Sequence, residues 1–172
     1  KVFIGDSITE QCNWNELFND VSMINRGIGG DVTEKVLSRL DFLKDTAPSA
    51  IFIQIGTNDL GLNIPIEKIM DNYNNIIQKI HRLSPNVQIF VQSVLPINQD
   101  LFLIRKENYT NDNIDILNNM IKKLEGGNVK YIDLNSHFKD SKGNLNKEYS
   151  SDGLHLNGSG YQKWKSIFIQ KS

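Results

Sequence analysis

Two periodicities alternate along this 172-residue chain, and that alternation limits its fold more than any other feature. Five short apolar runs have the length and composition of β-strands, at residues 2–4, 21–24, 51–55, 87–95 and 129–134. Apolar residues recur at helical spacing over residues 32–43, 66–83, 114–124 and 159–171, and a further helix is expected to start at Ser7. Strands joined through helices pair in parallel with right-handed crossovers. The sequence therefore predicts an α/β fold, a three-layer α/β/α sandwich around a five-stranded parallel sheet.

Four local signals mark where helices begin and end. Ser7 and Glu10 have the spacing of a capping box, in which the serine caps the first turn and the glutamate bonds back to it. The other three signals are a second capping-box spacing at Asp31 and Glu34, a proline suited to a first helical turn at Pro65, and a glycine cap at Gly126–Gly127. Ser7 also has a second interpretation, in which its hydroxyl is displayed at the end of the first strand as a reactive group.

The composition limits the class of protein and its partners. A length of 172 residues, 39% hydrophobic residues and a net charge of −1 fit one globular domain over residues 1–172. The sequence has no basic run of the kind that binds nucleic acid, and no apolar stretch of the roughly 18 residues that a membrane-spanning helix needs. We therefore expect neither nucleic-acid binding nor stable membrane insertion.

Cysteine usage and the start of the chain bear on the compartment. The single cysteine, Cys12, excludes an internal disulfide and a cysteine-based metal cluster, and it favours a reducing compartment such as the cytoplasm. Lys1 already lies at an expected strand, so a signal peptide or another domain could precede it. The localisation and the oligomeric state are left open by the sequence.

Small and polar residues gather after the predicted strands. Four such segments stand out, at residues 5–7, 25–31, 56–59 and 151–155, the last of them before the final helix. Open parallel sheets bind ligands at the carboxyl ends of their strands, so these segments are expected to meet at one edge of the sheet. This gathering is the first indication of an active site.

Ser7 and His155 are the candidate nucleophile and base. An alcohol becomes a competent nucleophile when a base takes its proton. Asp152 stands three residues before His155, where its carboxylate can hold the imidazole tautomer. The other histidines favour structural roles, since His81 lies near a helix end and His137 has no acidic neighbour in sequence.

Two candidate donors for an oxyanion lie in the same segments. Gly29–Gly30 can bring a backbone N–H close to a ligand because no Cβ intervenes, and Asn58 can offer a side-chain amide. Each also has a structural explanation, since glycines shape loops and asparagine favours turns. At one edge of a sheet, together with Ser7 and His155, they supply each part that an esterase needs.

The four segments resemble the sequence blocks of the SGNH (GDSL-type) hydrolases, in order and spacing over nearly the whole chain. The blocks are Gly5-Asp6-Ser7, Gly27-Ile28-Gly29-Gly30-Asp31, Gly56-Thr57-Asn58-Asp59 and Asp152-Gly153-Leu154-His155. The second block looks most similar to the branch of platelet-activating-factor acetylhydrolase catalytic subunits. The first block reads GDSIT where the family name expects GDSL, a conservative apolar change.

The resemblance implies a flavodoxin-like sheet with strand order 2-1-3-4-5 and no metal or organic cofactor. It implies Ser7 as the nucleophile, His155 as the base and Asp152 as the acid that orients the base. The implied oxyanion hole comprises the N–H groups of Ser7 and Gly30 and the side chain of Asn58. The residues expected to line the substrate-binding site are Asp6, Gly29 and Asp59.

We therefore expect a serine esterase that hydrolyses carboxylic esters through an acyl-enzyme. Short acyl groups, such as O-acetyl groups on a carbohydrate or small molecule, are the expected substrates. Lysophospholipid or thioester hydrolysis is the main alternative, and a non-catalytic, flavodoxin-like carbohydrate-binding module is a third. A nucleotide-binding module is disfavoured because the sequence has no P-loop and no G-x-G-x-x-G pattern.

The segment after the fourth expected strand, residues 96–110, has two interpretations. Loops of this length over an active site are often substrate walls or lids, but its apolar residues would also serve to pack the loop down. Trp14 and Tyr109 are likewise either stacking faces for a sugar or core aromatics, and the core is favoured for Trp14.

Overall fold

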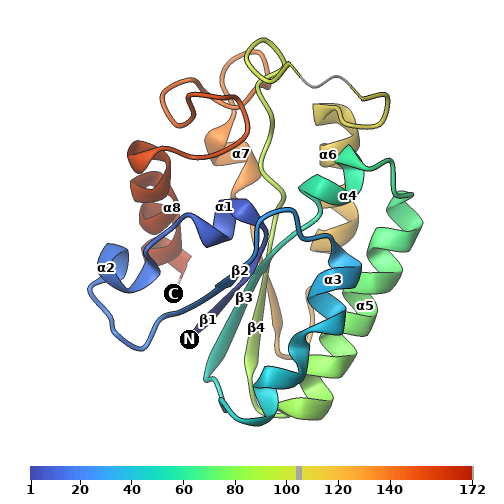
Figure 1. Cartoon of the computed structure of the whole chain (residues 1–172), viewed down its shortest axis with the longest axis vertical. Helices are drawn as coiled ribbons and strands as arrows, with labels where there is room; N and C mark the ends of the chain where they lie inside the picture. The colour runs from blue at the N-terminus through green and yellow to red at the C-terminus, as the bar shows by residue number, and fades with distance from the viewer. Residues whose placement is uncertain (104–105, 172) are drawn as a thin grey trace.

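The computed structural model of the chain is built around one parallel sheet (Figure 1). The structure describes residues 1–103 and 106–171, with no side chain described for residues 170 and 171. The strands are β1 (Val2–Gly5), β2 (Ile24–Gly27), β3 (Ala50–Gln54), β4 (Gln88–Gln92) and β5 (Val129–Ile132). They lie in the order β2-β1-β3-β4-β5, and each neighbouring pair is parallel. The predicted α/β fold and its strand order 2-1-3-4-5 are confirmed.

Helices cover both faces of the sheet (Figure 1). One face carries α3 (Thr33–Ser38), the 3₁₀ helix η1 (Leu40–Lys44), α5 (Ile66–Leu83) and α6 (Asn111–Lys122). The other face carries α2 (Trp14–Phe18) and α8 (Gly158–Lys171). Three short helices, α1 (Ser7–Glu10), α4 (Thr57–Gly61) and α7 (Asn135–Phe138), follow β1, β3 and β5. Among the described residues, no helix is long and apolar enough to cross a membrane.

Side chains of the central strand alternate between two apolar cores. In β3, Ile51 and Ile53 belong to the core under α3, α5 and α6, whereas Ala50 and Phe52 belong to the core under α2 and α8. This alternation is the two-residue period of a strand. All five residues of β3 are buried, because helices cover both faces of a parallel sheet.

The core under α2 and α8 is rich in aromatic side chains. Trp14 is only 1% exposed, and its ring stacks on that of Phe3 with 4.0 Å between centroids. The Trp164 ring meets the Trp14 ring edge-on at 5.1 Å. Trp14 is therefore a core residue and offers no free face to a sugar.

β2 lies further along the chain than predicted. The sequence predicts a strand at residues 21–24, but β2 begins at Ile24, and Val21 is 94% exposed in a turn. β2 is an edge strand without a fully buried residue, so Asn25 and Arg26 replace the apolar signal of an inner strand. β4 and β5 also end earlier than predicted, at Gln92 and Ile132.

The cap of α1 differs from the predicted capping box. Asp6 is the N-cap, and its Oδ1 accepts a hydrogen bond from the Ile8 N–H at 2.9 Å. Ser7 is therefore the first helical residue. Glu10 does not bond back to the serine but accepts from the Gly29 N–H at 3.0 Å. The prediction is wrong because an aspartate, which caps helices at least as well as serine, directly precedes Ser7.

The second predicted capping box is also absent. The N-cap of α3 is Val32, which makes no side-chain cap. Asp31 pairs instead with the Arg39 guanidinium, with 2.7 Å between Oδ2 and Nε. Glu34 lies in the first turn of α3, where a negative charge suits the helix N-terminus.

Two further helix signals are displaced from their predicted places. Pro65 is the N-cap of α5 and directly precedes its first turn. α6 ends at Lys122, before the glycines at Gly126–Gly127. These glycines form the turn into β5, where the Gly126 N–H donates to the Val129 carbonyl at 3.0 Å.

Candidate active site

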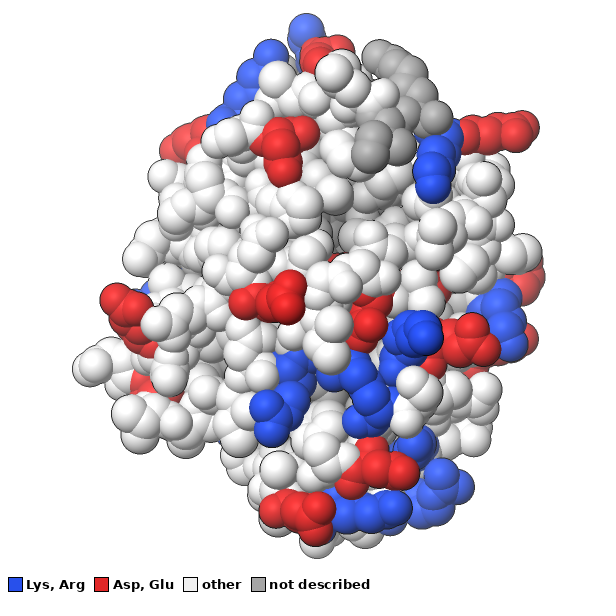
Figure 2. Space-filling view, in the orientation of Figure 1, with Lys and Arg blue, Asp and Glu red and all other residues white. Residues whose placement is uncertain are grey.

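Segments from distant parts of the chain converge at the carboxyl edge of the sheet. Ser7 opens α1 directly after β1, Gly29 and Gly30 follow β2, and Asn58 lies in α4 after β3. His155 comes from the loop before α8, which reaches the same edge at the top of Figure 1. On the face that Figure 2 shows, charged side chains of both signs lie along the top, and basic side chains gather in the lower half, around α3.

Ser7, His155 and Asp152 form a continuous chain of polar contacts. Ser7 Oγ lies 3.0 Å from His155 Nε2, and His155 Nδ1 lies 2.7 Å from Asp152 Oδ2. An ionised carboxylate only accepts hydrogen bonds, so Nδ1 carries the imidazole proton and Nε2 is free to accept from the serine hydroxyl. This arrangement suits removal of a proton from Ser7.

The second oxygen of Asp152 is held by the backbone. Its Oδ1 accepts from the N–H groups of Leu154 and His155, each at 2.8 Å. Partial burial opposes ionisation, but the hydrogen bonds from the His155 ring and from these two N–H groups outweigh it and lower the pKa of Asp152 below its ordinary value. Asp152 therefore faces the imidazole as a carboxylate.

The loop that carries His155 is fixed against the segment after β4. Gly153 has a φ of +84°, and a Cβ there would lie 2.8 Å from the Asn98 carbonyl oxygen and from the Phe102 nitrogen. The Asn98 N–H donates to the Gly153 carbonyl at 2.8 Å. Glycine is required at residue 153 both by the positive φ and by this close approach.

Three N–H groups at this edge of the sheet are the candidate donors that the sequence predicts for an oxyanion. Within the described residues, the N–H groups of Ser7 and Gly30 donate to no other protein group. Gly30 has a φ of +78°, which orients its N–H and favours glycine. The Asn58 amide donates one hydrogen bond to the Asp31 carbonyl at 2.9 Å, which orients the amide; its other N–H has no partner among the described residues.

Gly29 holds this loop next to the serine. A Cβ on Gly29 would lie 3.8 Å from Ser7 Cβ and 2.9 Å from a Glu10 carboxylate oxygen. The Glu10 carboxylate accepts from the Gly29 N–H at 3.0 Å. The loop after β2 is thereby tied to α1, the helix that carries Ser7.

Asp59 is fully buried and ties the first residue of α3 to α4. Its two carboxylate oxygens accept from the Thr33 N–H at 3.1 and 3.0 Å, and Oδ1 also accepts from the Thr33 hydroxyl at 2.5 Å. The Asn72 amide donates to the same hydroxyl oxygen at 2.9 Å. Burial raises the pKa of Asp59 above its ordinary value even though the Thr33 hydrogen bonds oppose the shift. Asn58, the next residue back along the chain, is held in place by these contacts.

Arg39 ties the loop after β2 to the end of β1. Its guanidinium pairs with Asp31 and donates to the Gly5 carbonyl at 3.2 Å. Gly5 itself packs so closely that a Cβ there would lie 2.1 Å from the Thr9 hydroxyl oxygen. Arg39, the C-cap of α3, therefore joins the loop after β2 to the end of β1, the strand that leads to Ser7.

Asp6 is a buried carboxyl group immediately before the nucleophile candidate. Its side chain is 0% exposed, and among the described residues its Oδ2 has no hydrogen-bond partner. Burial raises the pKa of Asp6 to about 7, although the Ile8 N–H and the charge of His155 oppose the shift. The Thr9 hydroxyl and the Gln54 amide are also buried without a protein partner in the described part of the chain. Asp6 is thus set to change its charge near neutral pH.

Several residues that shape the site were not expected from the sequence. Glu10 contacts Gly29, 19 positions away, and Arg39 contacts Asp31, 8 positions away. No local sequence motif predicts contacts over these separations. Thr33 meets Asp59 across 26 positions in the same way. The other histidines lie elsewhere: His81 in the last turn of α5, toward the amino ends of the strands, and His137 exposed in α7.

A cavity of about 410 Å³ opens beside the base and two of the donors. His155, Asn58 and Gly30 line part of it. The remaining described lining residues are mainly apolar and comprise Gly61, Leu62, Phe102, Lys106, Tyr109 and Leu154. The segment at 96–110 therefore does supply a wall of the site, as one of its two interpretations holds; its residues 104 and 105 lie outside the described chain.

Tyr109 is both a core residue and part of this wall. It is 6% exposed, and its hydroxyl lies 2.5 Å from the Thr57 hydroxyl. The Phe102 ring meets the Tyr109 ring edge-on at 5.7 Å. With its hydroxyl engaged by Thr57, Tyr109 contributes mainly ring carbons to the cavity.

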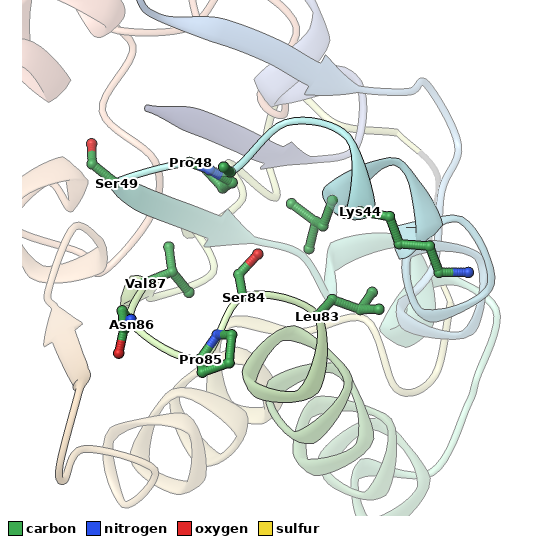
Figure 3. Close-up of a pocket in the computed structure, with 10 residues that line it drawn as sticks. Lys44, Pro48, Ser49, Leu83, Ser84, Pro85, Asn86 and Val87 are labelled. Carbon is green, nitrogen blue, oxygen red and sulfur yellow. The ribbon is translucent and has the colours of Figure 1, made fainter.

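A second cavity lies at the opposite edge of the sheet (Figure 3). Its volume is about 370 Å³, and it lies between the segments that precede β3 and β4. Leu83, Pro85 and Val87 supply apolar surface, while Lys44 and Ser84 supply polar atoms (Figure 3). Among the residues that the structure describes, no group of three His, Cys, Asp or Glu side chains is placed to hold a metal ion, here or elsewhere.

Comparison with known proteins agrees with this geometry. Residues 3–163 match the GDSL-like Lipase/Acylhydrolase family. Over 168 residues, the chain is 32% identical to platelet-activating factor acetylhydrolase IB subunit alpha2 of Rattus norvegicus, covering 94% of this chain and 71% of the relative. It is 30% identical to subunit alpha1 of Homo sapiens over 168 residues, covering 93% and 69%. A solved structure described as a platelet activating factor from Streptococcus pneumonia matches with a TM-score of 0.88 and 34% identity, and the match covers 99% of this chain and 82% of that one.

The chain therefore belongs to the GDSL-like lipase/acylhydrolase family and is a hydrolase. The family and the enzyme class predicted from the four sequence blocks are confirmed. The similarity to the platelet-activating-factor acetylhydrolase branch is also confirmed by its relatives.

Proposed function

We propose that the chain is a serine esterase in which Ser7, His155 and Asp152 form a catalytic triad. The observation that best supports this is the unbroken chain of contacts, 3.0 Å from serine to imidazole and 2.7 Å from imidazole to carboxylate. His155 takes the hydroxyl proton as Ser7 Oγ attacks the ester carbonyl. The resulting oxyanion accepts hydrogen bonds from the N–H groups of Ser7 and Gly30 and from the Asn58 amide.

The intermediate then collapses and breaks the bond to the alcohol. The alcohol leaves with the proton from His155, and the acyl group stays on Ser7. Water attacks this acyl-enzyme while His155 takes its proton, and the acid is released as the proton returns to the serine oxygen. Asp152 stays ionised throughout and stabilises the imidazolium. No step in this scheme needs a metal or an organic cofactor.

In this proposal, the three residues that the sequence predicts at the substrate-binding site, Asp6, Gly29 and Asp59, position other groups of the active site. Asp6 and Asp59 are fully buried, so a substrate in the cleft does not reach their carboxyl groups. Asp6 caps the helix that presents Ser7, and Asp59 holds the segment that presents Asn58. Gly29 brings its loop against Ser7 and leaves room for an ester beside the hydroxyl.

For the substrate we propose short acyl esters, acetyl esters first, of a carbohydrate or another small alcohol. The two mammalian relatives are named acetylhydrolases, which supports the acetyl group. The apolar walls of the 410 Å³ cavity favour one alternative, hydrolysis of longer acyl esters such as lysophospholipids or thioesters.

The test is hydrolysis of p-nitrophenyl acetate, butyrate, hexanoate and octanoate by the wild type and by Ser7→Ala. We expect activity that falls sharply beyond butyrate and that Ser7→Ala lowers by at least about 10³-fold. Activity that grows with chain length would retain the serine chemistry and favour the alternative substrate. Wild-type rates no higher than those of Ser7→Ala would contradict the esterase proposal and favour a binding module.

A further inference from the structure

We propose that Asn98 is a positioning residue for the acid–base pair, because its side-chain amide holds the turn whose backbone fixes the loop of Asp152 and His155. This inference rests on the proposed roles of those two residues. Asn98 is 1% exposed, so a substrate in the cleft does not reach its side chain. It acts on the reaction only through the groups that it holds.

The Asn98 side chain caps a single helical turn. Its Oδ1 accepts hydrogen bonds from the N–H groups of Asp100 and Leu101, at 3.1 and 3.3 Å. Its backbone carbonyl accepts from the N–H groups of Leu101 and Phe102, at 3.1 and 2.8 Å. This is the pattern of an asparagine at a helix N-cap, where the side chain supplies an acceptor that the first N–H groups lack. The side chain therefore sets the direction of the backbone at residue 98.

The other end of the same amide anchors the turn to a distant segment. Asn98 Nδ2 donates to the Leu145 carbonyl at 2.8 Å, and the Leu145 N–H donates to the Ile97 carbonyl at 3.1 Å. Leu145 is 0% exposed, so bulk water does not reach its carbonyl as a replacement partner. One side chain must here donate to a carbonyl and accept from two N–H groups. An amide does both, whereas a carboxylate only accepts.

The turn meets the loop of the acid–base pair at Gly153. The Asn98 N–H donates to the Gly153 carbonyl at 2.8 Å, and the Gly153 N–H donates to Ser150 Oγ at 3.0 Å. Asn98 and Ser150 are each 1% exposed, so buried partners hold Gly153 on both sides. Gly153 stands between Asp152 and His155 in the chain. A shift of Gly153 therefore moves the carboxylate relative to the imidazole.

The alignment of the pair is sensitive to such a shift. Residues 151–155 belong to no helix or strand, so contacts from other segments hold them in place. The contacts to be preserved are 2.7 Å from Asp152 to His155 and 3.0 Å from His155 to Ser7. A misplacement of about 1 Å can lower the rate of an enzyme by about 10²-fold. Asn98 thus contributes to the rate without contact with the reacting atoms.

Three single variants test the inference. Asn98→Ala removes both the cap and the contact with Leu145. Asn98→Ser keeps a hydroxyl that can cap the turn but lacks the amide that contacts Leu145. Asn118→Ala is the matched control, since Asn118 is 6% exposed and lies in α6. Both described hydrogen bonds of its amide go to Val94, at 2.7 and 2.9 Å, four residues before Asn98 in the same segment.

The expected loss lies in kcat. On p-nitrophenyl acetate, Asn98→Ala should lower kcat by about 10- to 10²-fold and change KM by less than about three-fold. Asn98→Ser should lower kcat by only about three- to ten-fold because the cap is kept. Asn118→Ala should keep kcat within about two-fold of the wild type, at a temperature where circular dichroism shows each variant folded. If Asn98→Ala does not fold, the same comparisons are made with Asn98→Ser.

A double variant distinguishes positioning of the pair from general support of the fold. Residues that act as one unit have non-additive effects on kcat. In Asp152→Asn the imidazole is no longer held by a carboxylate, so the further change Asn98→Ala should lower kcat by less than about three-fold. An equal loss of kcat from Asn98→Ala in the wild type and in Asp152→Asn would overturn the inference, because the effect would then not pass through the pair.

The remaining outcomes separate this inference from the esterase proposal. Suppose that hydrolysis depends on Ser7. If Asn98→Ala then keeps the wild-type kcat, raises KM alone, or loses no more kcat than Asn118→Ala, the role of Asn98 is wrong and the esterase proposal stands. If the wild type hydrolyses the ester no faster than Ser7→Ala does, both proposals fail.

Discussion

Two cavities of nearly equal volume lie at opposite edges of one sheet, about 410 Å³ at the carboxyl edge and about 370 Å³ at the amino edge. Each has apolar walls, and each includes one lysine, Lys106 in the first and Lys44 in the second. Only the first contains His155, Asn58 and Gly30. Size alone does not separate the two cavities, whereas convergent polar groups do.

The direction of the strands explains the difference. At the carboxyl edge, helices begin, so α1 and α4 present backbone N–H groups there. At the amino edge, α5 ends beside the second cavity and presents carbonyl groups. N–H groups stabilise a developing negative charge, whereas carbonyl oxygens repel it. Acyl transfer is therefore expected at the carboxyl edge only.

The largest effect should come from removing the base. We expect His155→Ala to lower kcat by about 10⁴- to 10⁶-fold, because His155 is the base that contacts the Ser7 hydroxyl in the described part of the chain. His81→Ala is the matched variant, since His81 lies in the last turn of α5 toward the amino edge. Initial rates on p-nitrophenyl acetate measure both. Circular dichroism checks that both variants are folded. A folded His81→Ala protein with as large a loss of kcat as His155→Ala would contradict the assignment of catalysis to the carboxyl edge alone.

A smaller loss is expected when the orienting carboxylate becomes an amide. Asp152→Asn keeps the shape of the side chain but allows the wrong imidazole tautomer, and we expect kcat to fall by about 10²- to 10⁴-fold. Initial rates on p-nitrophenyl acetate over a range of concentrations give kcat and KM separately. A kcat equal to that of the wild type would show that Asp152 does not orient His155.

Loss of one oxyanion donor should have a still smaller effect. Asn58→Ala should lower kcat by about 10²-fold and leave KM nearly unchanged, because the amide acts mainly on the transition state. Asn86→Ala is the matched change at the amino-edge cavity and should leave both constants unchanged. An increase in KM alone for Asn58→Ala would assign Asn58 to substrate binding instead.

The smallest expected effect concerns stability and pH. The raised pKa of Asp6, about 7, means that the folded protein holds a proton that the unfolded chain releases near pH 4. The free energy of unfolding therefore falls as pH rises through this window, by about 2 kcal/mol between pH 5 and pH 7 for this group. Asp6→Asn cannot ionise and should lose that slope, as urea unfolding at the two pH values would show.

Asp41 provides the control for this measurement. It lies in η1, and hydrogen bonding to Lys79, followed by the charge of Lys44, lowers the pKa of Asp41. The group is ionised in both folded and unfolded protein above pH 5, so Asp41→Asn should keep the wild-type slope between pH 5 and pH 7. An unchanged slope in Asp6→Asn as well would show that Asp6 does not hold its proton.

The sequence predicts the fold and the candidate triad because both depend on local patterns. Strand and helix periods are visible within each segment, and Ser7 and His155 each stand inside a short recognisable block. β2 is misplaced because an edge strand such as this one needs no apolar run. Glu10 is misassigned because its partner, Gly29, is brought near only by the pairing of β1 with β2. The ties that Arg39 and Asp59 make depend in the same way on contacts between distant segments.

The identity of the nucleophile can be measured most directly by covalent labelling. A fluorophosphonate reacts with an activated serine, and digestion with mass spectrometry locates the adduct. We expect one adduct on the wild type, on the peptide that contains Ser7, and no adduct on Ser7→Ala. His155→Ala should label far more slowly, because the hydroxyl then has no base. An adduct on another serine, or equal labelling of Ser7→Ala, would contradict the assignment of Ser7 as the nucleophile.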